Sequence, residues 1–189
     1  MPTGVLGIQG AVSEHVEMLE RLGEKAVIVK TADDLRGIGA LIIPGGESTT
    51  LGKFLGGGLG DGIKKLFRKG VPIYGTCTGL IVLGKVEGNS QHTLGLMDVS
   101  VQRNAFGRQA DSFESEIVFP AIGKKPFRCV FIRAPLIKKA GENVDVLGRF
   151  RNKIIFARQG NLLASSFHPE LTDDTRIHEY FLGMARSGK

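Results

Sequence analysis

Cys77 marks the place in the sequence where nucleophilic chemistry is most strongly indicated. It lies in the segment 75–79, which has glycine at both ends, between an apolar run at 71–74 that predicts a buried strand and one at 80–83 that predicts a helix. This is the form of a nucleophile elbow, whose glycines permit unusual backbone angles and close packing. The start of the helix would favour the thiolate, and the N–H of Thr78 would be free to bind an oxyanion. The alternative is a small buried thiol without a catalytic role.

His168 and Glu170 are the candidate partners of this cysteine. They follow a predicted strand at 162–167 in the order His-Pro-Glu, and catalytic groups of parallel α/β sheets gather beyond the carboxyl ends of strands. His168 could take the thiol proton and return it to a leaving ammonia, while Glu170 held the imidazole in the required tautomer. An extended His-Pro-Glu segment would keep the two side chains on one side. Taken alone, a histidine in this position is more often structural or exposed.

A third predicted strand, 40–43, ends in Pro-Gly-Gly-Glu-Ser. Gly46 and its neighbour Gly45 can present backbone N–H groups without obstruction, which makes them a second candidate oxyanion donor. The alternative is a simple turn, because Pro-Gly is a common turn signal. The remaining histidines, at 15, 92 and 178, fall in helix or loop contexts and lack the spacing of a metal site.

Length and composition indicate one globular domain spanning residues 1–189. The net charge of +6 comes from short, scattered basic groups, which do not interleave with aromatics as in a nucleic-acid groove. The two cysteines define no disulfide framework. No apolar stretch approaches the roughly 20 residues of a membrane helix, and the N-terminus lacks the pattern of a signal peptide. We therefore expect a cytoplasmic protein that binds neither nucleic acid nor membrane.

The order of predicted elements indicates an α/β fold. In the first half, strands alternate with helices, and the glycine-rich segment 56–62 should break any helix and form a loop. The predicted strands of this half are 5–8, 26–29, 40–43 and 71–74, and the predicted helices are 11–22, 48–55, 63–69 and one beginning at 80, with a short helix or turn at 33–38. Such alternation predicts a parallel sheet covered by helices on both faces.

The second half changes character, because its strands have short connections. They are predicted at 94–102, 114–119, 128–133, 144–150, 153–157 and 162–167, before a final helix at 173–186. The pair Arg151–Asn152 between two apolar runs indicates a tight hairpin. We therefore expect antiparallel additions in the C-terminal half of a mixed, mainly parallel sheet.

Taken together, Cys77 in Gly-Thr-Cys-Thr-Gly and the later Ser-Phe-His-Pro-Glu resemble the triad-type (class I) glutamine amidotransferases, in which Cys, His and Glu occur in this order. Other segments narrow the resemblance to the glutaminase subunits of two-component pyridoxal 5′-phosphate synthases. These segments are 4–10, 44–50, 102–109, 111–114, 131–135 and 166–172, and they span essentially the whole chain. The resemblance implies a three-layer, flavodoxin-like class I amidotransferase fold.

The resemblance also implies roles for individual residues. Cys77 would be the nucleophile, with His168 and Glu170 as its relay, and Gly46 and Thr78 would bind the oxyanion. The residues implied to contact glutamine are Gly46, Glu47, Ser48, Arg103, Ile132 and Arg133. An arginine suits the α-carboxylate of glutamine because it offers charge-assisted, bidentate hydrogen bonds. Gln9 is expected at a subunit interface or against the oxyanion loop.

The implied reaction is hydrolysis of L-glutamine to L-glutamate and ammonia through a Cys77 thioester. The ammonia would pass to a separate synthase subunit that builds pyridoxal 5′-phosphate (vitamin B6), in a ring of synthase subunits decorated with glutaminases. The glutaminase itself would need no cofactor and no metal. Members of this family are typically poor glutaminases until the synthase docks and arranges the oxyanion loop.

Two departures from the family pattern and two alternatives remain. Residue 78 is usually Ala and is Thr here, and the segment 56–62 is richer in glycine than usual. One alternative is a glutaminase that serves a synthase for histidine, nucleotides or anthranilate, against which the narrower segments argue. The other is a catalytically silent binding subunit, or a stress protein with a reactive elbow cysteine. The His-Pro-Glu segment argues against the stress protein, whereas Thr78 leaves the silent subunit open.

Overall fold

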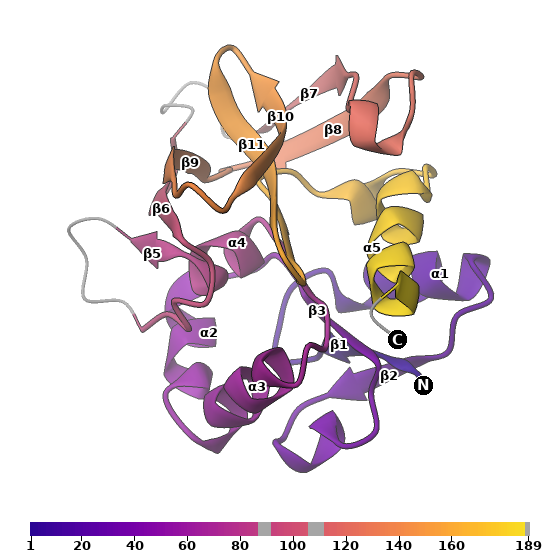
Figure 1. Ribbon diagram of the computed structural model, residues 1–189, viewed down its shortest axis with the longest axis vertical. Helices are drawn as coiled ribbons and strands as arrows, with labels where there is room; N and C mark the ends of the chain where they lie inside the picture. Colours follow the sequence, from indigo (N-terminus) through magenta and orange to yellow (C-terminus); the bar gives the residue numbers. More distant parts are fainter. Residues whose placement is uncertain (87–91, 106–111, 188–189) are drawn as a thin grey trace.

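The computed structural model describes residues 1–86, 92–105 and 112–187 (Figure 1). Its strands are β1 (Thr3–Leu6), β2 (Ala26–Val29), β3 (Ala40–Ile43), β4 (Ile73–Thr76), β5 (Lys85–Val86), β6 (Val99–Gln102), β7 (Ser112–Ile117), β8 (Phe127–Ile132), β9 (Leu136–Ala140), β10 (Asp145–Phe150), β11 (Lys153–Gln159) and β12 (Leu162–Ser165). Its α-helices are α1 (Val12–Arg21), α2 (Ser48–Leu55), α3 (Gly58–Arg68), α4 (Thr78–Leu83) and α5 (Arg176–Ser187), and its 3₁₀ turns are η1 (Asp33–Leu35), η2 (Pro120–Ile122) and η3 (Pro169–Leu171).

The described strands form one large mixed sheet and a separate two-stranded ribbon. The large sheet has the order β2-β1-β3-β4-β12-β11-β9-β6-β5, with β10 paired to β11, and the ribbon pairs β7 with β8. The strands from β2 to β12 are mutually parallel. When these parallel strands are numbered along the chain, with β12 as the fifth, their order across the sheet is the flavodoxin-like 2-1-3-4-5. Antiparallel pairs join β9, β10 and β11 to this core, as expected for the C-terminal half.

The central parallel strands β1, β3, β4 and β12 are buried along their whole length, as expected for strands that are covered on both faces. Alternate side chains enter two separate cores. The core that faces α1 and α5 contains the strand residues Val5, Ile42, Tyr74 and Leu163, which pack with Leu19, Ile177 and Phe181. Toward α2, α3 and α4 point Leu6, Leu41, Ile73 and Leu162, which pack with Leu51, Ile63 and Leu80. Figure 1 shows these two groups of helices on opposite sides of the sheet, which confirms the three-layer arrangement.

Aromatic side chains join the β7–β8 ribbon to the main sheet. Phe113 of β7 stacks on Phe150 of β10 with ring centroids 5.6 Å apart, and Phe119 stacks on Phe167 at 5.5 Å. Phe167 immediately precedes His168, and it also contacts Phe131 at 5.9 Å. Because large rings lose much apolar area from water, this cluster fixes the backbone on which His168 stands.

The hairpin at Arg151–Asn152 is confirmed. Both residues have positive φ, 47° and 64°, between the antiparallel strands β10 and β11. Two successive positive φ values are the signature of a type I′ turn, whose twist matches that of the flanking strands.

The prediction that the glycine-rich segment 56–62 forms a loop is wrong. Only residues 56–57 interrupt the helices, because α3 begins at Gly58 and includes the rest of the segment. A Cβ on Gly60 would lie 2.0 Å from the carbonyl oxygen of Leu55, and one on Gly62 would lie 2.6 Å from Cδ1 of Leu35. These glycines therefore permit close packing of α3, and tertiary contact outweighs their poor helix propensity.

Other element boundaries shift for identifiable reasons. The predicted strand 94–102 begins at Val99, since the N–H groups of Leu94 and Met97 instead bond the carbonyls of Val82 and Leu83 at the end of α4. The final helix begins at Arg176, whose N–H is capped by the Asp174 carboxylate at 3.1 Å. Strands β5 and β9 were not predicted.

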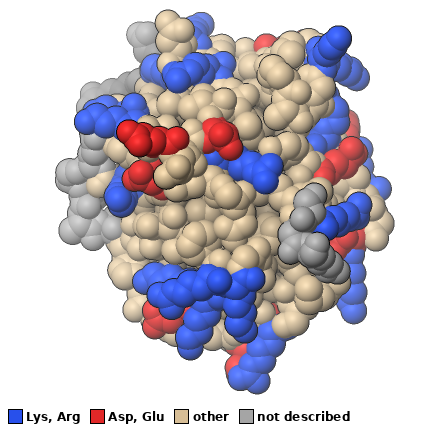
Figure 2. Space-filling model, in the orientation of Figure 1, with Lys and Arg blue, Asp and Glu red and all other residues tan. Residues whose placement is uncertain are grey.

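Basic side chains gather over one helix on the face shown in Figure 2. Figure 2 shows Lys and Arg gathered over α3, while elsewhere on this face basic and acidic side chains are interspersed. The α3 group consists of Lys64, Lys65 and Arg68, with Lys69 directly following. Among the described residues, no helix has the length and apolar character needed to span a membrane.

Replacing Gly60 with Ala should destabilise the protein, because the new Cβ would meet the Leu55 carbonyl at 2.0 Å. We expect the free energy of unfolding, measured by chemical denaturation, to fall by about 1–3 kcal/mol. The matched control is Gly58→Ala, since a Cβ there meets no atom within 4 Å. In that variant, the free energy should stay the same or rise by up to about 1 kcal/mol. Equal effects at the two positions would contradict this account of α3.

Candidate functional site

The predicted site residues meet at the carboxyl edge of the parallel sheet. Cys77 directly follows β4, which lies between β3 and β12. The pairing register sets Ile43 opposite Gly75 and Ser165 opposite Thr76, so the three strands end side by side. The N–H of Cys77 continues this pairing, with a hydrogen bond of 2.8 Å to the Ser165 carbonyl. The turns after the three strands therefore converge on one place.

Cys77 stands on a nucleophile elbow, as the sequence predicts. Its φ and ψ are 48° and −99°, which is a strained conformation for a residue with a side chain. The flanking glycines serve close packing: a Cβ on Gly75 would lie 2.5 Å from the carbonyl carbon of Gly79, and one on Gly79 would lie 2.2 Å from the Ile43 carbonyl oxygen. The nucleophile itself thus adopts the unusual backbone angles, and the glycines permit the close contacts.

His168 and Glu170 are joined by a buried hydrogen bond. Nδ1 of His168 lies 2.8 Å from Oε1 of Glu170, whose side chain is fully buried. The expectation of an extended His-Pro-Glu segment is wrong, because Pro169 begins the 3₁₀ turn η3. Proline keeps His168 out of the helical region, at ψ 89°, and is itself suited to the first position of a helical turn. The turn brings the carboxylate back to the imidazole.

The protonation of this pair follows from its surroundings. Burial lowers the pKa of His168, but hydrogen bonds with Cys77 and Glu170 and the charge of Glu170 outweigh it and raise that pKa to about 10. For Glu170, burial raises the pKa, while the electrostatic influence of His15 and the bond from His168 lower it below its ordinary value. The pair is therefore an imidazolium and a carboxylate at neutral pH. A cationic imidazole beside Cys77 is placed to give a proton to a leaving group.

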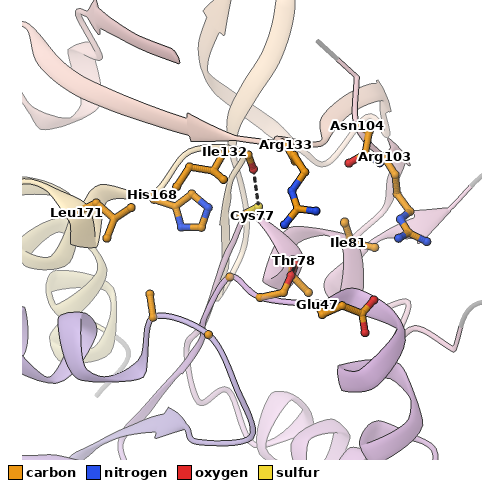
Figure 3. Close-up of a pocket in the computed structure, with 14 residues that line it drawn as sticks. Glu47, Cys77, Thr78, Ile81, Arg103, Asn104, Ile132, Arg133, His168 and Leu171 are labelled. Carbon is orange, nitrogen blue, oxygen red and sulfur yellow. Dashed lines mark hydrogen bonds between the residues drawn. The ribbon is translucent and has the colours of Figure 1, made fainter. Parts of the chain in front are cut away.

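A cavity of about 320 Å³ opens over Cys77, within the size range of small-molecule sites. Nine of the predicted residues line it: Gly45, Gly46, Glu47, Cys77, Thr78, Arg103, Ile132, Arg133 and His168. Figure 3 shows His168 on one side of Cys77 and Arg133 on the other, with the Arg133 guanidinium directed toward Thr78. The thiol of Cys77 lies 3.8 Å from the Ile132 carbonyl oxygen. Glu170 lies behind His168 and does not line the cavity.

Two predicted substrate contacts need comment. Ser48 begins α2 and is not among the residues that line the cavity, and its side chain lies outside what the structure describes. The carboxylate of Glu47 accepts the N–H of Thr50 at 2.7 Å, so it caps α2 as well as facing the cavity. Residues 106–111, which include part of the segments behind the resemblance, lie outside the described residues.

Hydrogen bonds hold the segments that carry the candidate oxyanion donors. The hydroxyl of Thr78 donates a hydrogen bond to the carbonyl oxygen of Gly46, and the side-chain amide of Gln9 donates one to the carbonyl oxygen of Glu47. The contact between Gln9 and this loop agrees with one of its two predicted positions. The prediction that Gly45 offers a free N–H is wrong, because that N–H donates to the hydroxyl of Thr76 at 3.1 Å. Gly45 instead lies directly against the triad, since a Cβ there would meet Cε1 of His168 at 2.3 Å.

Backbone strain gathers around the same cavity. The described non-glycine residues with positive φ are Cys77, Asn104, Arg133 and the hairpin pair 151–152. The first three all line the cavity. Strained backbone persists where the surrounding structure holds it, and it is concentrated at functional sites.

Sequence reasoning missed a buried polar group behind the triad. His15 on α1 lies 3.5 Å from Oε2 of Glu170, 3.2 Å from the hydroxyl of Thr76 and 2.9 Å from His178 on α5. The signal for His15 was its place in the apolar stripe of its helix, one turn after Val12 and before Leu19. A polar residue in a buried stripe calls for a polar partner. Among the described residues, no group of three or more His, Cys, Asp or Glu is arranged to hold a metal.

The sequence matches the SNO glutamine amidotransferase family over residues 5–187. It is 53% identical over 184 residues to the pyridoxal 5′-phosphate synthase subunit PdxT of Pelotomaculum thermopropionicum, covering 96% of this chain and 94% of that protein. It is 51% identical over 191 residues to the PdxT subunit of Niallia circulans, covering all of both chains. A solved structure described as a glutamine amidotransferase superposes with a TM-score of 0.94 at 46% identity, covering 98% of this chain and 100% of that one. The chain therefore belongs to the SNO glutamine amidotransferase family.

Proposed function

We propose that the chain hydrolyses L-glutamine to L-glutamate and ammonia through a thioester on Cys77, and that it supplies the ammonia to a separate pyridoxal 5′-phosphate synthase subunit. The observation that carries this proposal is that an elbow cysteine and His168 line one cavity, with Glu170 buried behind His168 and in contact with its ring. The synthase partner is proposed because relatives about half identical over the whole chain are subunits of that synthase.

The first half of the reaction releases ammonia. The sulfur of Cys77 attacks the side-chain amide carbon of glutamine, and a C–S bond forms as the carbonyl oxygen becomes an oxyanion. The backbone N–H groups of Thr78 and Gly46 are the proposed oxyanion donors. Collapse of the intermediate breaks the C–N bond, and the leaving nitrogen takes a proton from His168. A thioester and a neutral imidazole remain.

The second half restores the enzyme. Neutral His168 takes a proton from water as the water oxygen attacks the thioester carbon. The C–S bond breaks, L-glutamate leaves, and the thiolate and imidazolium are regenerated. Glu170 keeps the protonated Nδ1 of the ring toward itself throughout, so the other ring nitrogen always serves the reacting groups.

The substrate contacts are proposed from the lining of the cavity. Arg103 and Arg133 both reach it, and an arginine suits the α-carboxylate of glutamine. The backbone at Ile132 and Arg133, together with Gly46 and Glu47, encloses the rest of the cavity. Ser48 is retained in the proposed set only through the family resemblance. No bound cofactor or metal is invoked in the chemistry.

The assembly and its location are part of the same proposal. We expect a single amidotransferase domain, residues 1–189, that binds around a ring of synthase subunits. Docking would complete the site by arranging the turn that carries Gly46. The activity would operate in the cytoplasm, where thiols stay reduced. Both cysteines of the chain are free, as that setting requires of Cys77.

Replacing Cys77 with Ala should abolish glutamate and ammonia release, measured with the purified chain and its cognate synthase subunit, because no other group could form the thioester. Folding and synthase binding should persist, since the change removes one small side chain. Cys129→Ala is the matched control. The Cys129 thiol is fully buried in the core that faces α1 and α5, and burial raises its pKa, so activity should remain when it is removed. Release that survived in the Cys77 variant would mean that the nucleophile is wrongly assigned.

Wild-type behaviour in the same assay separates this proposal from a silent binding subunit. Strong stimulation of glutamine hydrolysis by the synthase is expected. A folded chain that bound the synthase but released nothing would favour the silent subunit, and the hydroxyl of Thr78 beside the nucleophile would be the first suspect.

Replacing Gly45 with Ala should reduce kcat by about 100-fold or more, because the new methyl group would push the His168 ring from its place. The comparison is Gly57→Ala, where a Cβ meets no atom within 4 Å and φ is −130°. That variant should keep full activity. Steady-state kinetics with the synthase present would test both, and a fully active Gly45 variant would show that His168 need not occupy this position.

The pH dependence of kcat should reflect the unusual basicity of His168. Its pKa is raised to about 10, so the proton that ammonia needs stays on the ring through neutral pH. The rate should therefore hold on the alkaline side and fall only as the pH rises through about 10. A pH–rate profile of the complex tests this. A fall centred near the ordinary histidine value of 6.5 would contradict the imidazolium assignment.

A further inference from the structure

Two histidines that take no part in the proposed chemistry lie directly behind the triad. His15 and His178 are both fully buried, and they come from helices at opposite ends of the chain. Nδ1 of His15 lies 2.9 Å from Nε2 of His178. Nε2 of His15 lies 3.5 Å from Oε2 of Glu170 and 3.2 Å from the hydroxyl of Thr76. A continuous chain of polar atoms therefore leads from His178 through His15 and Glu170 to His168.

Glu170 needs a second partner in addition to His168. Its side chain is fully buried, and Oε1 is occupied by Nδ1 of His168. Within the described part of the chain, Oε2 has no hydrogen-bond partner, and the group that faces it is Nε2 of His15 at 3.5 Å. A buried carboxylate is costly unless donors or positive charge oppose it. An N–H at Nε2 of His15 supplies that opposition through its positive end, which lies near Oε2 while the hydroxyl of Thr76 is its hydrogen-bond partner at 3.2 Å.

This requirement determines the tautomers of both histidines. If Nε2 of His15 carries the proton, its N–H donates to the hydroxyl of Thr76 with its positive end near Oε2 of Glu170, and Nδ1 is left as an acceptor. Nε2 of His178 must then carry the proton that it donates to His15 across 2.9 Å. The opposite arrangement would place the lone pair of His15 against the negative charge of Glu170. Electrostatics therefore selects the Nε2–H tautomer at both rings.

Both rings are neutral donors and acceptors in this arrangement. Burial lowers the pKa of His15, and it lowers that of His178 to about 3, with a further contribution from His15. The titratable groups around Glu170 are His168 beside it, His15 and the more distant Glu14 from α1, His178 from α5, and Tyr74 and Cys77 from β4 and its elbow. His168 is the one that carries the positive charge.

The same cluster also reaches the turn of the candidate oxyanion donors. The hydroxyl of Thr76 accepts the N–H of Gly45 at 3.1 Å, in addition to its contact with His15. The hydroxyl thereby lies between the imidazole behind the triad and the glycine turn beside it.

We propose that His15 is a positioning residue of the catalytic site: its neutral Nε2–H holds Oε2 of Glu170 and thereby keeps His168 aligned with Cys77, while His178 fixes the tautomer of His15. This inference rests on the proposed glutaminase activity and names a residue on which that activity depends.

The activity test compares His15→Leu with His15→Gln in the complex with the synthase. Leucine fills the space without a donor, whereas the amide of glutamine can direct an N–H at Oε2. We expect His15→Leu to lower kcat by about 10- to 100-fold with little change in KM, as for the loss of a hydrogen bond to a charged group. His15→Gln should recover most of kcat. The control is His92→Leu, at an exposed histidine away from the site, which should behave as wild type.

The pH profile separates positioning from packing. Without the donor, the carboxyl pKa of Glu170 should rise, so the acidic limb of the kcat profile should move to higher pH in His15→Leu and stay in place in His15→Gln. Equal losses in both variants, with no shift of the limb, would reduce His15 to a packing role and overturn the proposal. Full kcat in His15→Leu would overturn it as well.

A measurement without turnover keeps the inference distinct from the proposed function. Nitrogen-15 NMR of the imidazole rings in the wild-type chain should show His15 and His178 as neutral Nε2–H tautomers at neutral pH. A cationic His15, or one protonated on Nδ1, would overturn the proposal even if the enzyme were active. Should wild type release no ammonia, the glutaminase assignment would fail, whereas the ring spectra would still decide how Glu170 is held.

Discussion

The pairing of β4 between β3 and β12 is the constraint on which the site depends. Each strand delivers one component at its carboxyl end: the glycine turn, the elbow cysteine and the histidine. Since successive side chains of a strand point to opposite faces, a slip of one residue would turn each strand's core side chains to the wrong layer. The two separate cores therefore fix the register. Precision at the site is a consequence of burial on both faces of the sheet.

Close approach is the second requirement, and it explains where glycine and strain occur. At Gly75 and Gly79 the β4–α4 turn leaves no room for a Cβ, so the strand, the helix and β3 are locked together. The strained angles of Cys77 are held by that contact, at a cost on the order of 1–3 kcal/mol. The buried apolar side chains on either side of β4 offset it. A flexible nucleophile would not need this support, and a preorganised one does.

The sequence predicted what depends on local pattern and on strand ends. The elbow at Cys77 needs only a strand, two glycines and a helix in succession, and the strand-end rule was enough to bring His168 to it. His15 and His178 escaped prediction because their contact joins positions 163 residues apart through two packed helices. The helical glycines of α3 escaped because a contact with Leu55 outweighs their local preference. The 3₁₀ turn at Pro169 was not predicted because the φ angle of proline is compatible with both an extended segment and a 3₁₀ turn.

The distribution of charge behind Cys77 explains why one imidazole of three is cationic. Glu170 faces His168 at 2.8 Å and His15 at 3.5 Å, so its attraction favours the nearer ring. His168 also hydrogen-bonds with Cys77, whereas the pKa of His15 is lowered by complete burial and by the charge of His168. The proton therefore resides on the ring that lines the cavity. His15 and His178 can hold Glu170 because burial keeps both rings neutral. A charged His15 would compete with His168 for the same carboxylate and weaken the attraction that keeps a proton next to Cys77.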